Sequence, residues 1–348
     1  MPRLFFLLSG EYESLSFGEL KAILEAEGCG YILVEKLDQT VRLEADASSV
    51  QQIQRRSAYT RICALELFTS EANDEAIIQG AEETDFRAVL NEGETFAVRI
   101  RRIKEYSNRD ATMTIERKLG KQILQNTTGA SVNLKTPTKT FFGILTSHKL
   151  VFGLRLAEIQ PKPFVERRPR KKPFFHPSAM NAKLARCMVN LAHAKTGETV
   201  LDPFCGTGTT ILEASLIGCR AIGTDVQKRM INGTRRNLAH FDVAAEALLM
   251  ADARKPPFIR IGCMVTDPPY GKSATTLKST TKTIVETVLT SAKPLLSKGQ
   301  RICIASPKTI QIAKLGLTLG YRHVESHFAY VHRTLTREVA VFEKDDEK

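Results

Sequence analysis

The chain has 348 residues, of which 43% are hydrophobic and 25% charged, and these ordinary globular values exclude a disordered chain and allow about two domains. No segment approaches the roughly 20 apolar residues that span a bilayer, and seven scattered cysteines without a C-x-x-C pair favour reduced thiols in a cytoplasmic protein. The net charge of +12 favours a polyanionic partner.

The first part of the chain predicts the element order of a ferredoxin-like unit. Leu4–Leu8 predicts a strand, because no small-residue cleavage site of a signal peptide follows this apolar run. Ser16 and Glu19 match a capping box at the start of a helix, and Gly28 follows its end. Strands are then expected at 31–36, 40–44 and 61–68, and a helix at 48–57. The order β-α-β-β-α-β is typical of ferredoxin-like units.

The first excess of positive charge follows this unit. Residues 91–160 carry 12 basic and 6 acidic side chains, whereas residues 1–90 carry 8 and 16. A polyanion is therefore expected to contact the chain from about residue 91 onward. The pattern predicts strands at 95–103, 132–135, 141–146 and 150–156 and a helix at 111–125. Phosphate contacts and a solvated face are equally plausible readings of four cations on one strand edge. These cations are Arg99, Arg101, Arg102 and Lys104.

Residues 161–175, with net charge +5, predict a basic linker. Their closely spaced prolines exclude a helix and favour extended, semi-rigid chain. The charge excludes a core strand, and extended cations are candidates for contact with an RNA backbone. The candidates are Arg167, Arg168, Arg170, Lys171 and Lys172.

After the linker, strands and helices alternate, and this alternation predicts a parallel sheet covered on both faces. Strands are expected at 200–203, 221–225, 248–250, 263–267 and 301–305, and helices at 209–217, 227–240, 281–296 and 310–315. Two final strands, at 321–330 and 336–342, have a connection too short for a parallel crossover and should be antiparallel. Three histidines in this last region lack the register of a third ligand, so no metal site is expected.

The sequence TVLDPFCGTGTT, residues 199–210, predicts a ligand-binding loop, since open α/β sheets bind ligands where parallel strands end. Gly206 and Gly208 let a ligand lie against the backbone, and Asp225 can accept hydrogen bonds from ribose hydroxyls. A nicotinamide cofactor fits poorly, because Ile211 replaces the third glycine of G-x-G-x-x-G and Asp202 would repel a pyrophosphate. Asp202 instead suits a cation, and S-adenosylmethionine has an amino group, a ribose and no phosphate.

A G-x-G pair alone is explained about half the time by a structural turn. The hypothesis therefore depends on the acids that follow successive strands. Asp252, in the sequence ADAR after the third strand, is expected to accept a hydrogen bond from the adenine amino group.

The sequence VTDPPYG, residues 265–271, predicts a catalytic loop. Two prolines have fixed φ and donate no N–H, so the Asp267 carboxylate and the Pro268 carbonyl can hold the N–H groups of a planar amine. These acceptors favour the positive charge that develops on its nitrogen, Asp267 can take up the proton, and Tyr270 can stack on the base. Pro269 completes the motif, and Lys272 could contact a phosphate beside the target. A merely rigid turn is the alternative.

The motifs DPFCGTGTT, DAR and TDPPYG, with Asp225 between the first two, resemble the class I amino-methyltransferases. The segment FHPSAM, residues 175–180, and the following ARCMVNLAHAKTGETVLD resemble one branch, the archaeal-type tRNA guanine(10)-N2-methyltransferases. The resemblance implies that FHPSAM and the glycine loop hold S-adenosylmethionine. The implied cofactor-binding residues are His176, Pro177, Ser178, Asp202, Phe204, Gly206, Gly208, Thr209, Asp225, Val226, Asp252 and Ala253.

The resemblance also implies a domain layout. FAVRIRR and VFGLRLAEI resemble, more loosely, a THUMP domain, an RNA-binding module that docks tRNA. The expected order is an N-terminal ferredoxin-like domain at 1–60, a THUMP domain at 61–160, the linker at 161–175 and the methyltransferase domain at 176–348. The fold class is then α/β, a Rossmann-like class I methyltransferase with an antiparallel C-terminal strand pair, joined to an α+β ferredoxin-like/THUMP half.

The expected function is transfer of a methyl group from S-adenosylmethionine to the exocyclic N2 amine of a tRNA guanosine, at position ten by resemblance, giving one or two methyl groups. The target base must leave its stack. The alternatives are a DNA adenine or cytosine amino-methyltransferase, because DPPY occurs there too, and a non-catalytic RNA-binding scaffold. A cytoplasmic monomer is expected, and some relatives use a small zinc-binding activator protein.

Overall fold

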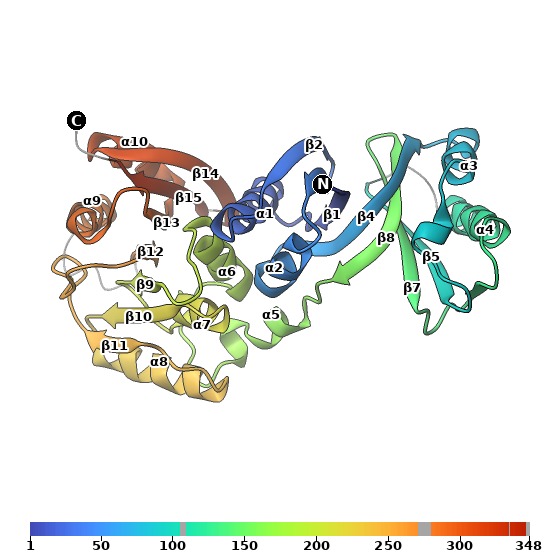
Figure 1. The fold of residues 1–348 in the computed structure, drawn as a ribbon. Coiled ribbons are helices and arrows are strands. Elements are labelled where there is room, and N and C mark those ends of the chain that lie inside the picture. The colour runs from blue at the N-terminus through green and yellow to red at the C-terminus, as the bar shows by residue number, and fades with distance from the viewer. Residues whose placement is uncertain (105–108, 271–279, 334, 346–348) are drawn as a thin grey trace. The chain divides into compact units, whose positions relative to one another are not determined.

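The computed structural model describes residues 1–104, 109–270, 280–333 and 335–345, and the side chains of 109–111 are not considered. The chain forms two compact units (Figure 1). Among the described residues, no helix has the length and apolar character needed to cross a membrane. The first unit contains Met1–Glu13, Cys29–Gln54 and Thr60–Ile159, and the second contains Ser14–Gly28, Arg55–Tyr59 and Gln160–Lys348.

The first unit is built on an eight-stranded sheet in the order β2-β3-β1-β4-β8-β7-β5-β6. The antiparallel order β2-β3-β1-β4 agrees with the predicted ferredoxin-like unit. The bounds are β1 Arg3–Leu8, β2 Tyr31–Leu37, β3 Thr40–Ala45, β4 Thr60–Glu71, β5 Thr95–Arg102, β6 Ser131–Val132, β7 Lys139–Thr146 and β8 Lys149–Glu158, with α2 at Ser49–Arg56, α3 at Asp74–Glu82 and α4 at Arg109–Gln125. Strand β4 pairs with both β1 and β8, so one sheet carries both predicted N-terminal domains, and the boundary at residue 60 remains a prediction.

Four phenylalanines pack in the core cluster against the second half of this sheet. Phe86 and Phe96 meet Phe141 edge-on, and Phe141 stacks on Phe152 at 6.1 Å between ring centroids. Such pairs stabilise beyond their buried area. Helix α3, which the sequence pattern missed, begins where the Asn73 side chain accepts a hydrogen bond from the Ala76 N–H.

The second unit is built on a seven-stranded sheet in the order β11-β10-β9-β12-β13-β15-β14. Strands β9 to β13 are parallel to one another. Strand β15 is antiparallel to β13 and β14 is antiparallel to β15, so the predicted class I methyltransferase fold is confirmed. The bounds are β9 Thr199–Asp202, β10 Arg220–Asp225, β11 Ala247–Met250, β12 Cys263–Thr266, β13 Arg301–Pro307, β14 Tyr321–His332 and β15 Leu335–Lys344, with α6 at Ala182–Leu191, α7 at Thr209–Leu216, α8 at Lys228–His240, α9 at Thr281–Ala292 and α10 at Ile312–Thr318.

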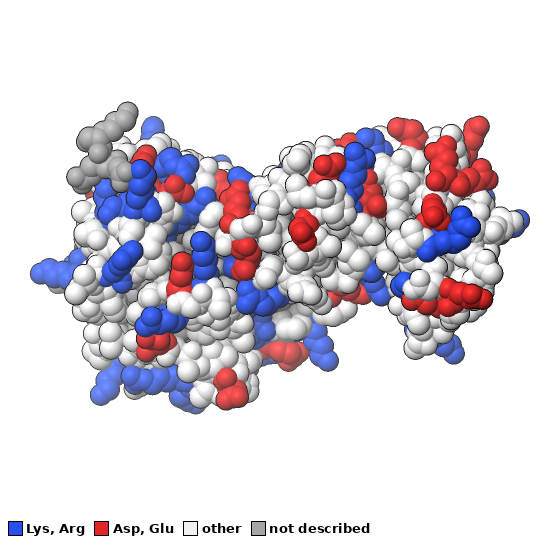
Figure 2. Space-filling model, viewed as in Figure 1, with Lys and Arg blue, Asp and Glu red and all other residues white. Residues whose placement is uncertain are grey.

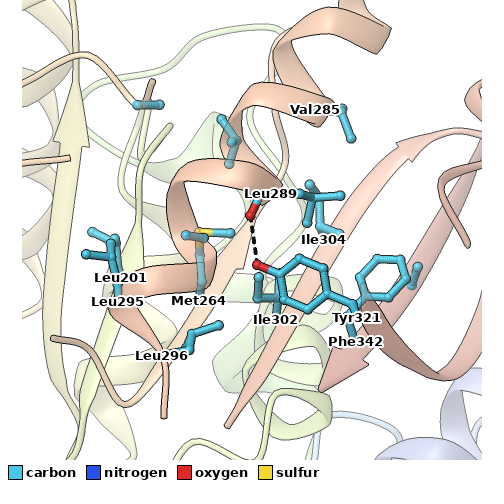
Figure 3. Close-up of a cluster of buried hydrophobic side chains, with 14 of the residues drawn as sticks. Leu201, Met264, Val285, Leu289, Leu295, Leu296, Ile302, Ile304, Tyr321 and Phe342 are labelled. Atoms are coloured by element: carbon cyan, nitrogen blue, oxygen red, sulfur yellow. Dashed lines mark hydrogen bonds between the residues drawn. The ribbon is translucent and has the colours of Figure 1, made fainter. Parts of the chain in front are cut away.

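Helices α9 and α10 both contribute side chains to a buried apolar cluster on this sheet. Figure 3 shows Val285 and Leu289 of α9 in this cluster. Met264, Ile302 and Ile304 from the strands share one buried cluster with Val285 and Leu289 of α9, and all five are almost completely buried. The Tyr321 hydroxyl is buried in the same cluster and donates to the Leu289 carbonyl oxygen at 2.7 Å. This satisfied hydroxyl and the close packing hold the β12 and β13 ends in place.

Helix α1, Glu13–Ala26, groups with the second unit although β1 and β2 belong to the first. It begins three residues before the predicted Ser16, so the predicted capping box is wrong. The reason is that Ser16 and Glu19 are both buried, and the Glu19 carboxylate accepts hydrogen bonds from the Ala58 and Tyr59 N–H groups and from Asn190 of α6. A buried carboxylate needs such donors, and here they come from distant parts of the chain.

The linker is helical where extended chain was predicted. Helix α5 spans Lys162–Glu166, and Pro169–Lys171 form a short 3-10 turn. Prolines occupy the first turn of each element, where no N–H donor is needed, so their presence does not exclude a helix. Phe164 is buried, and the Arg167 and Arg186 guanidinium groups lie 4.7 and 5.7 Å from its ring centroid. The linker therefore packs on the second unit.

Candidate active site

Three acidic residues meet at the carboxyl edge of the second sheet. Asp202 ends β9, Asp225 ends β10, and Asp267 directly follows β12. Strand β9 pairs in parallel with both β10 and β12, so all three strands end at the same edge. Asp202 also accepts a hydrogen bond at 2.8 Å from the hydroxyl of Thr266, the residue before Asp267. The predicted grouping of these acids is thus present in the fold.

The glycine loop needs both of its glycines. Gly208 has a φ of +77°, and a Cβ there would lie 2.4 Å from the Thr234 methyl carbon. Gly206 has a φ of +50°, and a Cβ there would have no neighbour closer than the Phe204 carbonyl oxygen at 3.8 Å. The Gly206 N–H donates to the Asp225 carboxylate at 3.2 Å. Gly206 therefore leaves open space directly above the backbone, where a ligand can lie.

Asp202 lies beneath this loop and suits a cationic ligand. It is 3% exposed and accepts hydrogen bonds from the Thr266 hydroxyl and the Phe204 N–H. Burial is the main cause that raises its pKa to about 7; the neighbouring Asp267 adds to this rise and the hydrogen bonds oppose it. Among the described residues, no ion pair with a Lys or Arg is found for it. An ammonium group in the pocket would relieve the cost of this buried carboxylate.

A strap formed by residues 172–180 closes one side of the loop. The Lys172 amine donates to the Thr209 hydroxyl at 2.8 Å at the start of α7. The Asn237 side chain of α8 donates to the carbonyl oxygens of both Phe174 and Thr207 at 2.9 Å. A single amide thus ties the strap to the glycine loop.

The strap, the loop and Asp267 together line one pocket. His176 lies at its mouth, where the Ser178 N–H donates to its Nδ1. Asp202, Asp267 and the loop provide the polar wall, and Met180 and Met230 provide apolar surface. The lining residues are His176, Ser178, Ala179, Met180, Asp202, Phe204, Cys205, Gly206, Thr207, Thr209, Thr210, Met230 and Asp267.

Beside the pocket, Asp267, Tyr270 and Arg337 of β15 form one network. Arg337 Nη2 lies 3.1 Å from Asp267 Oδ2, Arg337 Nε donates to the Tyr270 hydroxyl, and that hydroxyl donates to Oδ2 at 3.5 Å. Burial raises the pKa of Asp267 to about 6, and the Arg337 cation works against this rise. Oδ1 is buried and has no hydrogen-bond partner among the described residues. A buried acceptor without a donor is costly, so Oδ1 is suited to receive an N–H of a ligand.

The structure brings several predicted cofactor residues to the pocket and leaves others outside its lining. Asp252 makes a close ion pair with Arg254, at 2.5 Å, which lowers the pKa of its carboxyl. Val226 and Pro177 are exposed, and the Ala253 side chain belongs to the hydrophobic core. The cofactor roles of these four residues remain predictions.

Sequence reasoning missed several residues of the site. Met180, Met230 and Thr210 line the pocket, and Arg337 reaches the catalytic loop from β15. The strand around Arg337 was predicted, but no motif links it to Asp267, which lies 70 residues earlier. Thr210 lies inside the quoted TVLDPFCGTGTT motif, so that motif could have identified it.

The predicted RNA contacts divide into exposed and buried side chains. Arg167 and Lys172 are wrong as phosphate contacts, because Arg167 pairs with the fully buried Glu213 at 2.6 Å and Lys172 is 5% exposed. Burial lowers the pKa of the Lys172 amine to about 8. Arg168, Arg170 and Lys171 are exposed, as are Arg101, Arg102 and Lys104, while Arg99 is partly buried and donates to the Val98 and Leu134 carbonyl oxygens. Lys272 lies outside the described residues.

An unpredicted group of cations lies on α8. Figure 2 shows Lys and Arg gathered along the edge of the second unit over this helix. Lys228, Arg229, Arg235 and Arg236 are exposed, and the helix contains no acidic residue. The positive surface that the sequence predicts from about residue 91 onward therefore includes α8.

Comparison with known proteins gives consistent matches. A family model for the RMKL-like methyltransferase domain matches residues 169–337, and one for a DNA methylase matches residues 73–236. The tRNA (guanine(10)-N2)-dimethyltransferase of Methanothermobacter thermautotrophicus is 35% identical over 340 residues, which are 97% of this chain and 98% of that protein. The protein of the same name from Methanocaldococcus jannaschii is 30% identical and covers 97% of this chain and 99% of its own length.

Solved structures share the fold over the whole chain. TrmN from Thermus thermophilus superposes with a TM-score of 0.54 at 21% identity, covering 98% of this chain and 99% of its own. SMU.472, solved in complex with SAH, superposes with a TM-score of 0.56 at 16% identity, covering 100% and 99%.

Proposed function

The chain belongs to the tRNA (guanine(10)-N2)-dimethyltransferase family, and from this we propose that its second unit methylates the exocyclic N2 amine of a tRNA guanosine with S-adenosylmethionine as the donor. The observation that carries the proposal is the buried Oδ1 of Asp267, which has no described donor and lies in the same pocket wall as the glycine loop. An aromatic amine supplies the missing N–H.

The residues of the pocket fit the methyl donor. Asp202 is a buried carboxylate suited to the donor's ammonium group, Gly206 leaves space above its backbone, and Asp225 lies at the next strand end for ribose hydroxyls. When bound, S-adenosylmethionine supplies an electrophilic methyl group. The residue assignments are part of the proposal.

The catalytic loop then acts on the amine. We assign one N–H of guanine N2 to Asp267 Oδ1 and the other to the Pro268 carbonyl oxygen. Both acceptors favour the charge that develops on nitrogen, and Asp267 takes the released proton. Arg337 fixes Oδ2, so that Oδ1 faces the substrate, and Tyr270 contacts the base.

The DNA amino-methyltransferase and the RNA-binding scaffold are weaker alternatives. The DNA methylase match ends at residue 236, before the catalytic loop begins. A scaffold needs neither the buried acid beneath the loop nor the Asp267 network. The THUMP assignment and the tRNA contacts of the exposed cations remain parts of this proposal.

The proposal is tested by mass spectrometry of nucleosides from an unmodified tRNA transcript incubated with the protein and S-adenosylmethionine. We expect N2-methylguanosine, with N2,N2-dimethylguanosine if the second methyl group is also added. A transcript with inosine at position ten is the matched control, because hypoxanthine lacks only the exocyclic amine, and it should stay unmethylated there. Methylation of a ring nitrogen, of ribose or of DNA in place of this product would contradict the proposal.

The same assay addresses the partners. We propose that the chain acts as a monomer, which light scattering on the assayed sample tests. Running the assay with the purified chain alone shows whether it needs the small zinc-binding activator that some relatives use.

Arg337 should act as a positioning residue for Asp267. The carboxylate accepts the amine only when ionised, so turnover should fall as the pH drops through about 6. Arg337→Gln removes a cation that opposes the rise of this pKa, so the fall should begin at higher pH, and kcat at neutral pH should drop about 10-fold or more. Arg337→Lys should keep the pH profile closer to that of the wild type.

The control is Arg322→Gln, because Arg322 pairs with Glu343 on the same strand pair, away from the catalytic loop. Its pH profile should match that of the wild type. An unchanged profile for Arg337→Gln as well would show that Arg337 has only a structural role.

A further inference from the structure

Two large aromatic side chains are exposed near the end of β14. Phe328 is 48% exposed and Tyr330 is 63% exposed. They alternate with His327 and Ala329, which are 5% and 0% exposed, so both aromatic rings lie on the solvent-facing side of the strand. We call Phe328 and Tyr330 the aromatic shelf.

The aromatic shelf lies at the same sheet edge as the catalytic loop. Strand β13 is parallel to β12 and antiparallel to β15, and β14 is antiparallel to β15, so the end of β14 reaches the edge where β12 ends. Phe328 pairs with Glu338 and Tyr330 with Thr336, the two neighbours of Arg337. The buried Ala329 between the two aromatic residues pairs with Arg337, so the shelf lies at the same sheet edge as Arg337 and projects from the opposite face of the sheet.

The shelf has a cationic border. The Lys308 amine, directly after β13, lies 5.2 Å from the centre of the Phe328 ring. The carboxylate nearest in register, Glu338, is 5% exposed and accepts a hydrogen bond from the Ser326 hydroxyl. Exposed aromatic rings beside a cation, with the adjacent acid buried, are the combination that binds single-stranded nucleic acid.

We propose that Phe328 and Tyr330 stack on RNA bases next to the flipped target guanosine, with Lys308 contacting the neighbouring phosphate. This inference rests on the proposed function. Flipping a base out of a helix leaves its neighbours without one stacking partner, and an aromatic ring at the same edge supplies a replacement. Stacking tolerates any base, so the shelf contributes to affinity and to base flipping. Asp267 selects the exocyclic amine.

The first experiment uses the absence of tryptophan from the chain. Tyr330→Trp and Phe328→Trp each introduce the only tryptophan, and unmodified tRNA transcript should quench its fluorescence strongly on titration, because stacking on a base quenches indole. Ile259→Trp is the matched control, since Ile259 is 95% exposed and precedes β12 on the opposite edge of the sheet. Its fluorescence should change little. Equal quenching at positions 330 and 259 would contradict stacking at the shelf.

The second experiment measures tRNA affinity directly. Phe328→Leu and Tyr330→Leu keep an apolar side chain but remove the ring, and each should weaken binding of the transcript about 5- to 100-fold while binding of S-adenosylhomocysteine is unchanged. Tyr330→Phe keeps the ring and should bind as the wild type does. Wild-type affinity in both leucine variants would overturn the inference and would leave a protein partner as the occupant.

The two experiments distinguish a failure of the aromatic shelf from a failure of the proposed function. If the wild type binds tRNA and quenches the shelf tryptophan but makes no N2-methylguanosine, the proposed activity fails and the shelf stands. If it makes N2-methylguanosine and the shelf variants show no change in binding or quenching, only the shelf fails.

Discussion

Replacing Asp267 by Asn should lower the turnover number by about 10²-fold or more, because the amide keeps the shape of the carboxyl group but cannot take the charge or the proton from the amine. In the wild type Oδ1 has no described donor and Oδ2 is held by Arg337. The substitution therefore removes the anionic acceptor for the substrate and the negative charge that Arg337 contacts at Oδ2. Single-turnover kinetics with saturating cofactor measure this loss.

Cofactor binding separates a catalytic role of Asp267 from a structural one. Calorimetry with S-adenosylhomocysteine should give an affinity within a few-fold of the wild type, since the proposed cofactor contacts come from Asp202, Asp225 and the glycine loop. Glu246→Gln is the control, because Glu246 pairs with Arg220 on the surface of the same unit and lies outside the pocket lining. Turnover near the wild-type value in Asp267→Asn would refute the assignment of Asp267.

Replacing Glu213 by Gln should lower the free energy of unfolding by about 3–5 kcal/mol, the usual cost of removing one partner from a buried ion pair. Glu213 is fully buried and pairs with Arg167 of the linker and Arg186 of α6, at 2.6 and 2.8 Å. Its negative charge also acts on the buried Lys172 amine. Without this charge, three cations are left in one small volume. Urea unfolding of the full chain measures the change.

Glu246→Gln again provides a matched comparison, because it breaks a Glu–Arg pair in which both side chains are about half exposed. Solvent screens that pair, so its loss should change the free energy of unfolding far less than the loss of Glu213 does. A similar, small loss in both variants would show that the Glu213 cluster does not hold the linker. A larger loss for Glu213→Gln shows that the buried cluster, to which the linker contributes Arg167 and Lys172, stabilises the second unit.

The cluster has a consequence for dissecting the chain. A fragment that begins at residue 176 lacks Arg167 and Lys172, and also helix α1 with Glu19. It would leave Glu213 with one of its two described partners and would remove the strap contact to Thr209. The methyltransferase half is therefore best tested within the full chain.

The sequence by itself determined the features that are encoded by neighbouring residues. Strand and helix periodicity predicted the ferredoxin-like order β2-β3-β1-β4 and the parallel sheet with its antiparallel end, because each pattern repeats within one element. The glycine loop was predictable because Gly206 and Gly208 adopt positive φ, a conformation that favours glycine at those two positions. The acids at successive strand ends followed from parallel topology, which places those ends at one edge.

Only the tertiary structure decided which charged groups meet. Arg337 approaches Asp267 from a strand 70 residues away, and Lys172 and Arg167 turn into the second unit instead of facing solvent. Helix α1 begins at Glu13, and Glu19 forms no capping box with Ser16, because its hydrogen-bond donors are Ala58, Tyr59 and Asn190. A buried charge takes whatever partner the packed fold brings within reach. The spacing of residues in the sequence does not predict which charged groups lie close together in space. A run of basic residues can therefore form either an exposed linker or part of a buried cluster.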